Sequence, residues 1–176
     1  TVPSNITLEQ SMEPDTGYGI MGSAGMVNQI IVNLCNNAVQ AMKEKGGCIT
    51  VKGSLIMDGD SMKYAVTVSD NGPGMSPEIQ KQIFTPFFTT KKQGEGTGLG
   101  LSVVQDLIHE VSGESNVVSV EGKGTRFDIL FPVFQIQEEE KRTSDLHTFA
   151  QYSVLILDDD EKVGEALGRT LRKHCK

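Results

Sequence analysis

A glycine-rich stretch in the second half of the chain reads GEGTGLGL, residues 94–101, and runs directly into a helical pattern at residues 99–111. Glycines at 96, 98 and 100 can aim successive backbone N–H groups at an anion, and a helix N-terminus adds partial positive charge. The stretch lacks the closing Gly-Lys-Ser/Thr of a Walker loop and the spacing of the dinucleotide fingerprint. It predicts a phosphate-binding loop, and a flexible loop that happens to precede a helix is the alternative.

A second motif, DNGPGM at residues 70–75, follows an alternating strand pattern. Gly72 and Gly74 let the backbone approach a flat ligand closely. Asp70, at the strand end, can accept hydrogen bonds from an exocyclic amine such as that of adenine. An ordinary turn is the alternative, because Asp, Asn, Gly and Pro are the usual turn residues.

A polar stripe runs along the first long helical pattern, at residues 25–45, and includes Gln29, Asn33, Asn37 and Gln40. Asn33 and Asn37 are four residues apart, so their amides lie together on one side of a helix. An amide oxygen is a hard ligand suited to Mg²⁺, which typically keeps several waters and shares a substrate phosphate. An exposed polar face is the alternative.

The remaining pattern predicts an α+β sandwich, a mainly antiparallel sheet with helices on one face. The expected elements are a strand at 5–11, a loop at 12–23, a helix at 25–45, strands around 49–55 and 64–68, a short helix at 76–84, an irregular stretch at 85–97, a helix at 99–111, and strands at 117–121 and 125–131 that end at Pro132. The expected apolar helix faces are Val27, Ile30, Ile31, Leu34, Ala38, Ala41 and Met42 in the first long helix, and Leu99, Val103, Leu107 and Val111 in the last.

The order of these motifs resembles the ATP-binding domain of sensor histidine kinases. The helix with NLCNNAVQAM (33–42), then DNGPGM, then FTPFFTTK (84–91), then the glycine-rich stretch is similar to the N, G1, F and G2 boxes of that family. The family belongs with DNA gyrase and MutL in the GHKL superfamily, so the resemblance implies a Bergerat fold over about residues 5–133. The phenylalanine-rich stretch favours the kinases over the other branches.

The resemblance also implies roles for single residues. Asn37 is expected to bind Mg²⁺, Asp70 the adenine amine with Gly72 and Gly74 allowing close approach, and Thr125 the adenine through a water. Gly96, Thr97, Gly98, Leu99 and Gly100 are expected to hold the phosphates, and Lys91 to reach one of them. Asn33 stands where gyrase-like ATPases carry a glutamate base, and because an amide cannot be a base, hydrolysis is expected to be poor. Gln40 replaces a cation that many relatives carry, which puts a cationic phosphate contact from this helix in doubt.

The implied function is transfer of the γ-phosphoryl group of Mg²⁺-ATP to a histidine on a separate dimerisation and phosphoacceptor domain, which lies upstream in this family. None of His109, His147 and His174 lies in a helix that precedes the N box at residues 33–42, so we expect the acceptor to lie outside this chain. Two alternatives remain: a GHKL ATPase that drives a conformational clamp, and a degenerate nucleotide-binding or interaction module without catalysis.

The C-terminal part of the chain changes in composition. We expect the ATP-binding domain at 1–134, a linker at 135–152 and an N-terminal receiver fragment at 153–176, because VLILDDD (154–160) resembles the first strand of a response-regulator receiver. A charged turn is the alternative for the acidic triplet. This order implies a hybrid kinase that is cut at both ends, with a receiver domain as a further partner.

Composition excludes several classes of function. A net charge of −7 argues against a nucleic-acid surface, and three widely spaced cysteines match no zinc site or disulfide framework. No run of about 18 apolar residues occurs, so we expect no direct membrane contact by this chain. A cytoplasmic location is expected, with a parent protein that membrane segments could anchor.

Overall fold

One six-stranded sheet organises the residues that the computed structural model describes, which are 3–13, 17–91 and 96–136. They fall within one compact unit, Pro3–Ile136. The strands are β1 (Ile6–Met12), β2 (Tyr18–Ile20), β3 (Gly47–Asp58), β4 (Ser61–Asp70), β5 (Glu114–Val120) and β6 (Gly124–Gln135). The helices are α1 (Ala24–Met42), α2 (Pro77–Gln80) and α3 (Gly100–Glu110).

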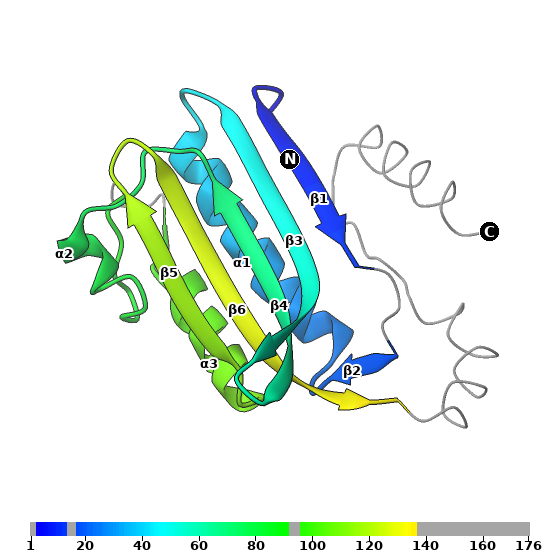
Figure 1. Ribbon diagram of the computed structural model, residues 1–176. Helices are drawn as coiled ribbons and strands as arrows, with labels where there is room; N and C mark the ends of the chain where they lie inside the picture. Colours follow the sequence, from blue (N-terminus) through cyan, green and yellow to red (C-terminus); the bar gives the residue numbers. More distant parts are fainter. Residues whose placement is uncertain (1–2, 14–16, 92–95, 137–176) are drawn as a thin grey trace. The chain divides into compact units, whose positions relative to one another are not determined.

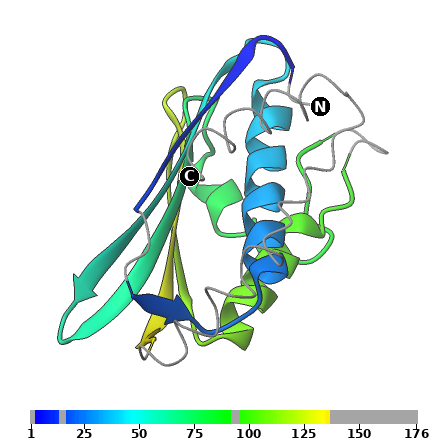
Figure 2. The same cartoon turned by 90° about the vertical axis from the view of Figure 1, so that its right-hand side faces the viewer.

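The sheet is mainly antiparallel and carries its long helices on one face. Its strands follow the order β1-β3-β4-β6-β2, and β5 also pairs with β6. β1 runs parallel to β3, while β2, β4 and β5 each pair antiparallel with β6, and β3 with β4. Figures 1 and 2 show α1 and α3 on the same side of the sheet. The expected α+β sandwich is therefore confirmed.

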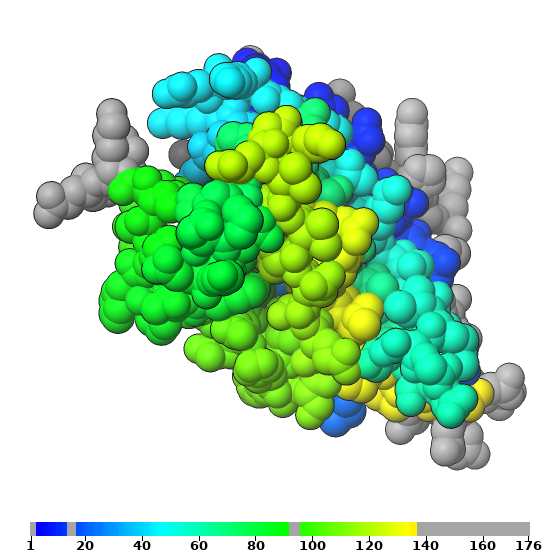
Figure 3. All heavy atoms as spheres, turned by 60° about the vertical axis from the view of Figure 1, so that its left-hand side comes forward, coloured from blue at the N-terminus to red at the C-terminus, as the bar shows by residue number. Residues whose placement is uncertain are grey.

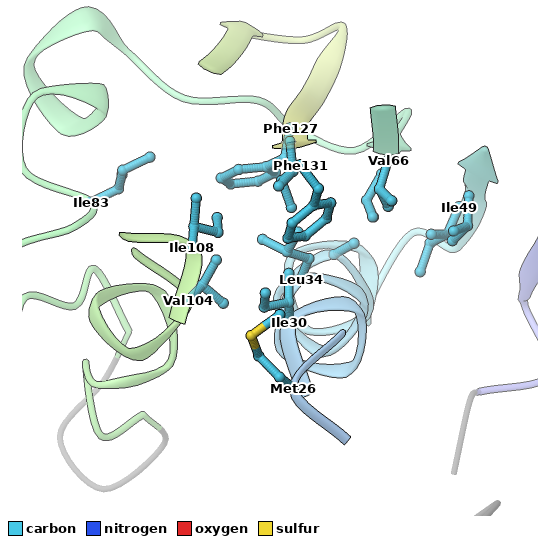
Figure 4. Packing of buried hydrophobic residues seen from close by; sticks show 14 of the residues in the cluster. Met26, Ile30, Leu34, Ile49, Val66, Ile83, Val104, Ile108, Phe127 and Phe131 are labelled. Carbon is cyan, nitrogen blue, oxygen red and sulfur yellow. The ribbon is translucent and has the colours of Figure 1, made fainter. Parts of the chain in front are cut away.

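The hydrophobic core fills the space between this face of the sheet and the two helices. Alternate residues of the central strands point into it, as in Val66 and Val68 of β4, and all the inward side chains of β6 from Phe127 to Phe131 are buried. In Figure 4, Val66 of β4 and the two phenylalanines of β6, Phe127 and Phe131, converge with Ile30 of α1 and Ile108 of α3. Full burial of one such side chain stabilises the fold by about 1.5–3 kcal/mol.

Ser23 is the N-cap residue of helix α1, and its hydroxyl accepts a hydrogen bond from the backbone N–H of Met26 at 3.1 Å. Such a cap satisfies one of the free N–H groups of the first turn. Its buried residues recur every four positions and form one stripe against the sheet: Met26, Ile30, Leu34, Ala38 and Met42. Asn33 and Asn37 lie beside this stripe and are half-buried. Packing of the stripe therefore sets the direction of the asparagines.

Two strand predictions are wrong. Residues 12–23 are not one continuous loop, because β2 lies within them and pairs with residues 133–135 of β6. Pro132 does not end the last strand, since β6 continues to Gln135, the first residue of the expected linker. Pro132 is the last residue paired with β4, and pairing with β2 starts at the next residue. Proline has no backbone N–H, and it is tolerated at position 132 because the pairing with β4 ends there and the pairing with β2 has not yet begun.

The helix predictions also need correction. α2 ends at Gln80 instead of residue 84, and Ala41 of α1 is exposed. In α3 the buried residues are Ser102, Val104 and Ile108, whereas Leu99 is 37% exposed. Apolar residues cover a wide arc of α3, so periodicity alone could not decide which row faces the core. The expected linker from residue 137 on and the receiver fragment lie outside the described residues.

Candidate functional site

A cavity of about 730 Å³ lies between α1, the loop after β4 and the segments that flank the glycine-rich stretch. This volume is in the usual range of small-molecule sites, about 300–1,000 Å³. Residues within 33–41 of α1 line it, together with residues within 73–83, 88–91 and 96–101 from the second half of the described domain. It brings together eight of the predicted site residues: Asn33, Asn37, Gly74, Lys91, Gly96, Thr97, Gly98 and Gly100.

Four predicted site residues, Asp70, Gly72, Leu99 and Thr125, are not part of this lining. Asp70 and Thr125 are register partners on β4 and β6, so their side chains leave the same face of the sheet. Gly72 lies two residues after Asp70, in the loop whose residues 73–75 do line the cavity. Leu99 is the N-cap residue of α3, and its exposed side chain makes no cap hydrogen bond. Of the predicted adenine contacts, Asp70, Gly72 and Thr125 therefore lie outside the cavity lining.

The asparagines of α1 face the start of α3. Asn33 Oδ1 lies 3.5 Å from the point where a Cβ at Gly100 would stand. Asn36 and Gln40 line the cavity as well, so four amide side chains of α1 converge on it. The half-burial of Asn33 and Asn37 argues against the alternative of a simple solvated face.

Backbone contacts with the segment after α2 hold the glycine-rich stretch in place. The N–H of Phe87 donates a hydrogen bond to the carbonyl of Gly98 at 2.9 Å. Gly98 has a φ of +66°, and a Cβ there would overlap the backbone of Phe87. Phe87 itself has a φ of 66°, which is rare for a bulky side chain. Only glycine fits at position 98 without moving this segment.

The hairpin of β5 and β6 supports the loop after β4. The N–H of Gly122 donates to the carbonyl of Pro73 at 2.7 Å. Gly74 has a φ of +67°, and a Cβ there would overlap the carbonyl of Val120. Packing within the protein therefore requires glycine at position 74, one of the two glycines of the DNGPGM motif.

The Asp70 side chain is partly buried and accepts a hydrogen bond from the loop that follows it. Its Oδ1 accepts a hydrogen bond from the N–H of Gly72 at 2.8 Å. Burial raises the pKa of Asp70 above its ordinary value, and the backbone amides of Gly72 and Thr125 partly oppose that shift. A carboxylate that is short of solvent is a strong acceptor for a donor on a ligand.

Residues 22–135 match the family described as "Histidine kinase-, DNA gyrase B-, and HSP90-like ATPase". The chain belongs to this family. Its sequence relatives are sensor histidine kinases. They include Sensor histidine kinase ZraS of Salmonella typhi, 39% identical over 120 residues, and Sensor kinase CckA of Brucella abortus, 36% identical over 170 residues. These alignments cover 68% and 83% of this chain, but only 24% and 18% of the two relatives.

Solved structures of histidine kinases share the fold. The catalytic domain of histidine kinase ThkA superposes with a TM-score of 0.58 at 29% identity, over 73% of this chain and 80% of that one. Full-length ShkA in complex with AMPPNP gives a TM-score of 0.61 at 28% identity, over 74% of this chain and 26% of that one. The expected histidine kinase ATP-binding domain is therefore confirmed.

A magnesium ion is expected in this domain from the family resemblance, and the cavity lining offers amide side chains as candidate ligands. No group of three or more His, Cys, Asp or Glu side chains among the described residues could hold a metal ion by itself. Amide oxygens of Asn33 and Asn37 are hard ligands, and Mg²⁺ usually takes only one or two protein ligands beside phosphates and water. The donor set thus fits a Mg²⁺ ion that arrives with a nucleotide.

Two polar residues next to the cavity were not predicted from the sequence. Gln80 of α2 and Ser119 of β5 make hydrogen bonds to the loop that lines the cavity. Ser119 and Val117 share the inward face of β5, since they pair with Thr125 and Phe127 of β6. The signal that could have found Ser119 is its place in phase with Val117, on the face of β5 that is directed to the core. No helix in the described ranges is long and apolar enough to cross a membrane.

Proposed function

We propose that this domain binds ATP with Mg²⁺ in the cavity and donates the γ-phosphoryl group to a histidine on a separate dimerisation and phosphoacceptor domain, in two-component signal transduction. The ATP-binding family, the sensor kinase relatives and the cavity that joins α1 to the glycine-rich stretch support this proposal. We propose that this reaction takes place in the cytoplasm.

One observation carries the choice of transfer over hydrolysis. The described residues that line the cavity include no aspartate, glutamate or histidine. Asn33 occupies the position from which a base would act, and an amide cannot accept a proton from water at neutral pH. A site without a base favours a nucleophile that is brought in by another domain.

The proposed step is a displacement at the γ-phosphorus. A neutral imidazole nitrogen of the acceptor histidine forms the new N–P bond while the bond from phosphorus to the β,γ-bridging oxygen breaks. The bond electrons leave with ADP, and the imidazole later loses its proton to solvent. Phosphoryl transfer of this kind requires mainly positioning and charge stabilisation.

The proposed residue roles are those that the family resemblance implies. In the proposal Asn37 would hold the Mg²⁺ ion, which would neutralise phosphate charge, and Lys91 would add a cation beside Gln40, about one turn along α1 from Asn37. Backbone N–H groups from Gly96 to Gly100 and the N-terminus of α3 hold the phosphates. Asp70 and Thr125 hold the adenine beside the cavity wall, with Gly72 letting the ring approach.

The parent protein is proposed to be a hybrid kinase. The alignment with CckA covers 83% of this chain, a larger share than the 68% that aligns with ZraS. This is consistent with the division into a catalytic domain at 1–134, a linker at 135–152 and a receiver fragment at 153–176. The receiver domain is then a second partner of the kinase.

The test is calorimetry of ATP binding with and without Mg²⁺, on the natural chain, Asp70→Asn and Asn37→Asp. We expect saturable binding that Asp70→Asn abolishes and whose Mg²⁺ dependence changes in Asn37→Asp. A second assay measures transfer of labelled γ-phosphate to an added helical phosphoacceptor domain. Binding without transfer would indicate a non-catalytic nucleotide module, and absence of binding at millimolar ATP would contradict the proposal.

A further inference from the structure

The edge of the sheet at β5 has covered backbone groups. The side-chain Nε2 of Gln80, in α2, donates to the carbonyl of Ser119 at 3.0 Å. The N–H of Gly122, in the turn after β5, donates to the carbonyl of Pro73 at 2.7 Å. Figure 3 shows the green segment around α2 packed beside the yellow-green strand β5. Natural proteins commonly cover a sheet edge in this way, which prevents pairing with another chain.

The edge at β1 has no such cover among the described residues. β1 stands at the end of the strand order and pairs with β3 alone among the described strands. It lies outermost beside β3 in Figure 1. Its sequence, ITLEQSM, contains one charged residue, Glu9, and no proline, and its pairing with β3 has no bulge. Charges, prolines and bulges are the devices that usually protect an edge strand, so β1 is poorly protected.

Alternate backbone groups of β1 are directed away from β3. The carbonyl of Asn5 accepts a hydrogen bond from the N–H of Gly47, and the N–H of Glu13 donates to the carbonyl of Gly53. The N–H and C=O of one residue leave the same side of a strand, and successive residues alternate. The odd-numbered residues from 5 to 13 are therefore directed to β3, and the even-numbered residues to the open edge. Those that follow Ile6 are Leu8, Gln10 and Met12.

Two of these residues also carry exposed apolar side chains. Leu8 is 48% exposed and Met12 is 46% exposed. The register partner of Leu8 on β3 is Ile49, which belongs to the core, so Leu8 and Met12 leave the face of the sheet that carries the helices. Helix α1 packs over β3 and β4 and leaves these two side chains uncovered. Open backbone groups and exposed apolar side chains therefore coincide on β1.

A second copy of β1 fits this edge in one antiparallel register. Two identical strands pair about a twofold axis, so one residue faces its own copy. With Gln10 on the axis, Leu8 faces Met12 of the second copy and Glu9 faces Ser11. Both exposed apolar side chains then gain a cross-strand neighbour, and all three open positions gain a hydrogen-bonded partner. With Glu9 on the axis two carboxylates face each other, which is destabilising, and with Leu8 on the axis Met12 lies beyond the paired strand.

We propose that β1 is a docking surface for a second copy of this chain, with the two β1 strands paired antiparallel about Gln10. The pairing is isologous and closes as a dimer, because each copy uses the same edge. Contacts below about 1,200 Å² are typical of weak association, and one strand edge is a small contact, so the dimer forms at high protein concentration. The proposal is independent of the proposed function, since no residue of β1 lines the cavity.

Sedimentation velocity of the whole 176-residue chain over a concentration series measures the association. We expect a dimer that increases with concentration. Gln10→Pro removes an N–H that faces the open edge and leaves the hydrogen bonds to β3 in place. Because each copy loses one hydrogen bond across the axis, the dissociation constant of the dimer should rise at least about tenfold. Gln10→Ala keeps the N–H and should associate like the natural chain.

Two results would overturn the proposal. One is a natural chain that stays monomeric over the whole series, and the other is equal association of Gln10→Pro and Gln10→Ala. Crosslinking tests the register in a background in which the three native cysteines are replaced by serine. Gln10→Cys should form an intermolecular disulfide more efficiently than Glu9→Cys, because facing Cα atoms of a hydrogen-bonded pair lie about 5.5 Å apart. More efficient crosslinking of Glu9→Cys would show that the register is wrong.

Hydrogen exchange on the natural chain provides a test that needs no substitution and decides the matter if circular dichroism shows that Gln10→Pro is unfolded. The amides of Leu8, Gln10 and Met12 should exchange more slowly as the protein concentration rises. The amides of Glu9 and Ser11, which are directed to β3, should show no such change. Exchange that is independent of concentration in both sets, or that slows equally in both, would contradict pairing through the open edge of β1.

Discussion

The ammonium group of Lys91 donates a hydrogen bond to the side-chain oxygen of Gln40, which joins the segment after α2 to helix α1. Both residues line the cavity. Burial lowers the pKa of Lys91, which indicates a partly desolvated ammonium group at the cavity wall. The family resemblance leads us to expect a cation at position 40 in many relatives, and here the hydrogen bond brings a cation to Gln40 from another segment.

Lys91→Met is expected to weaken Mg²⁺-ATP binding about tenfold and to leave adenosine binding nearly unchanged, because the lost contact is to a phosphate. A charge-assisted hydrogen bond is worth roughly 1.5–3 kcal/mol, and about 1.4 kcal/mol corresponds to tenfold in affinity. Calorimetry with ATP and adenosine measures both effects.

The matched control places the cation on the other segment. Gln40→Lys in the Lys91→Met background is expected to recover part of the lost ATP affinity, since the ammonium group again lies at the contact point of the two side chains. A double variant that binds ATP no better than Lys91→Met would contradict this account of the pair.

Most residues of the cavity lining could be predicted as site residues from the sequence because they lie in local patterns. The pairing of Lys91 with Gln40 could not, since the two residues are 51 positions apart and meet only through tertiary packing. The short strand β2 was missed for a similar reason: its three residues gain strand structure from pairing with the far end of β6. In α3 the apolar arc is wide, so its buried row was decided by contact with α1 and the sheet.

Asn33→Glu is expected to raise basal ATP hydrolysis at least tenfold, because it places a carboxylate base where the described cavity lining has none. A positioned base contributes about 10²–10⁴-fold to such a step. Release of inorganic phosphate measures the rate. Asn36→Glu is the control, as residue 36 lines the same cavity from an exposed position of α1 and should leave hydrolysis unchanged. Equal rates for both variants at saturating ATP would refute the role given to position 33.

Asp70→Asn is expected to raise the melting temperature at pH 7 while abolishing ATP binding. The folded-state pKa of Asp70 is raised by burial, so its ionised form costs stability at neutral pH. That cost disappears as the pH falls through the raised pKa and the carboxyl takes up a proton. The difference in melting temperature between the variant and the natural chain should therefore shrink toward acid pH.

ATP binding by the natural chain should weaken over the same pH window, because a protonated Asp70 is a poorer acceptor for the adenine amine. Thermal denaturation and calorimetry between pH 7 and the ordinary carboxyl range near about pH 4 measure both properties. A melting-temperature difference that grows toward acid pH would show that the shift has the opposite sign.

Gly98→Ala is expected to destabilise the domain more than Gly59→Ala, although both glycines have a similar positive φ of +66° and +60°. A Cβ at Gly59 meets nothing within 4 Å, so alanine there costs only the left-handed backbone conformation, roughly 1–2 kcal/mol. At Gly98 the same atom overlaps the backbone of Phe87, so the segment after α2 must also move. Urea denaturation should show the larger loss for Gly98→Ala, and calorimetry should show weakened ATP binding in this variant alone. Equal losses of stability with equal ATP affinities would mean that the contact between Phe87 and Gly98 does not shape the site.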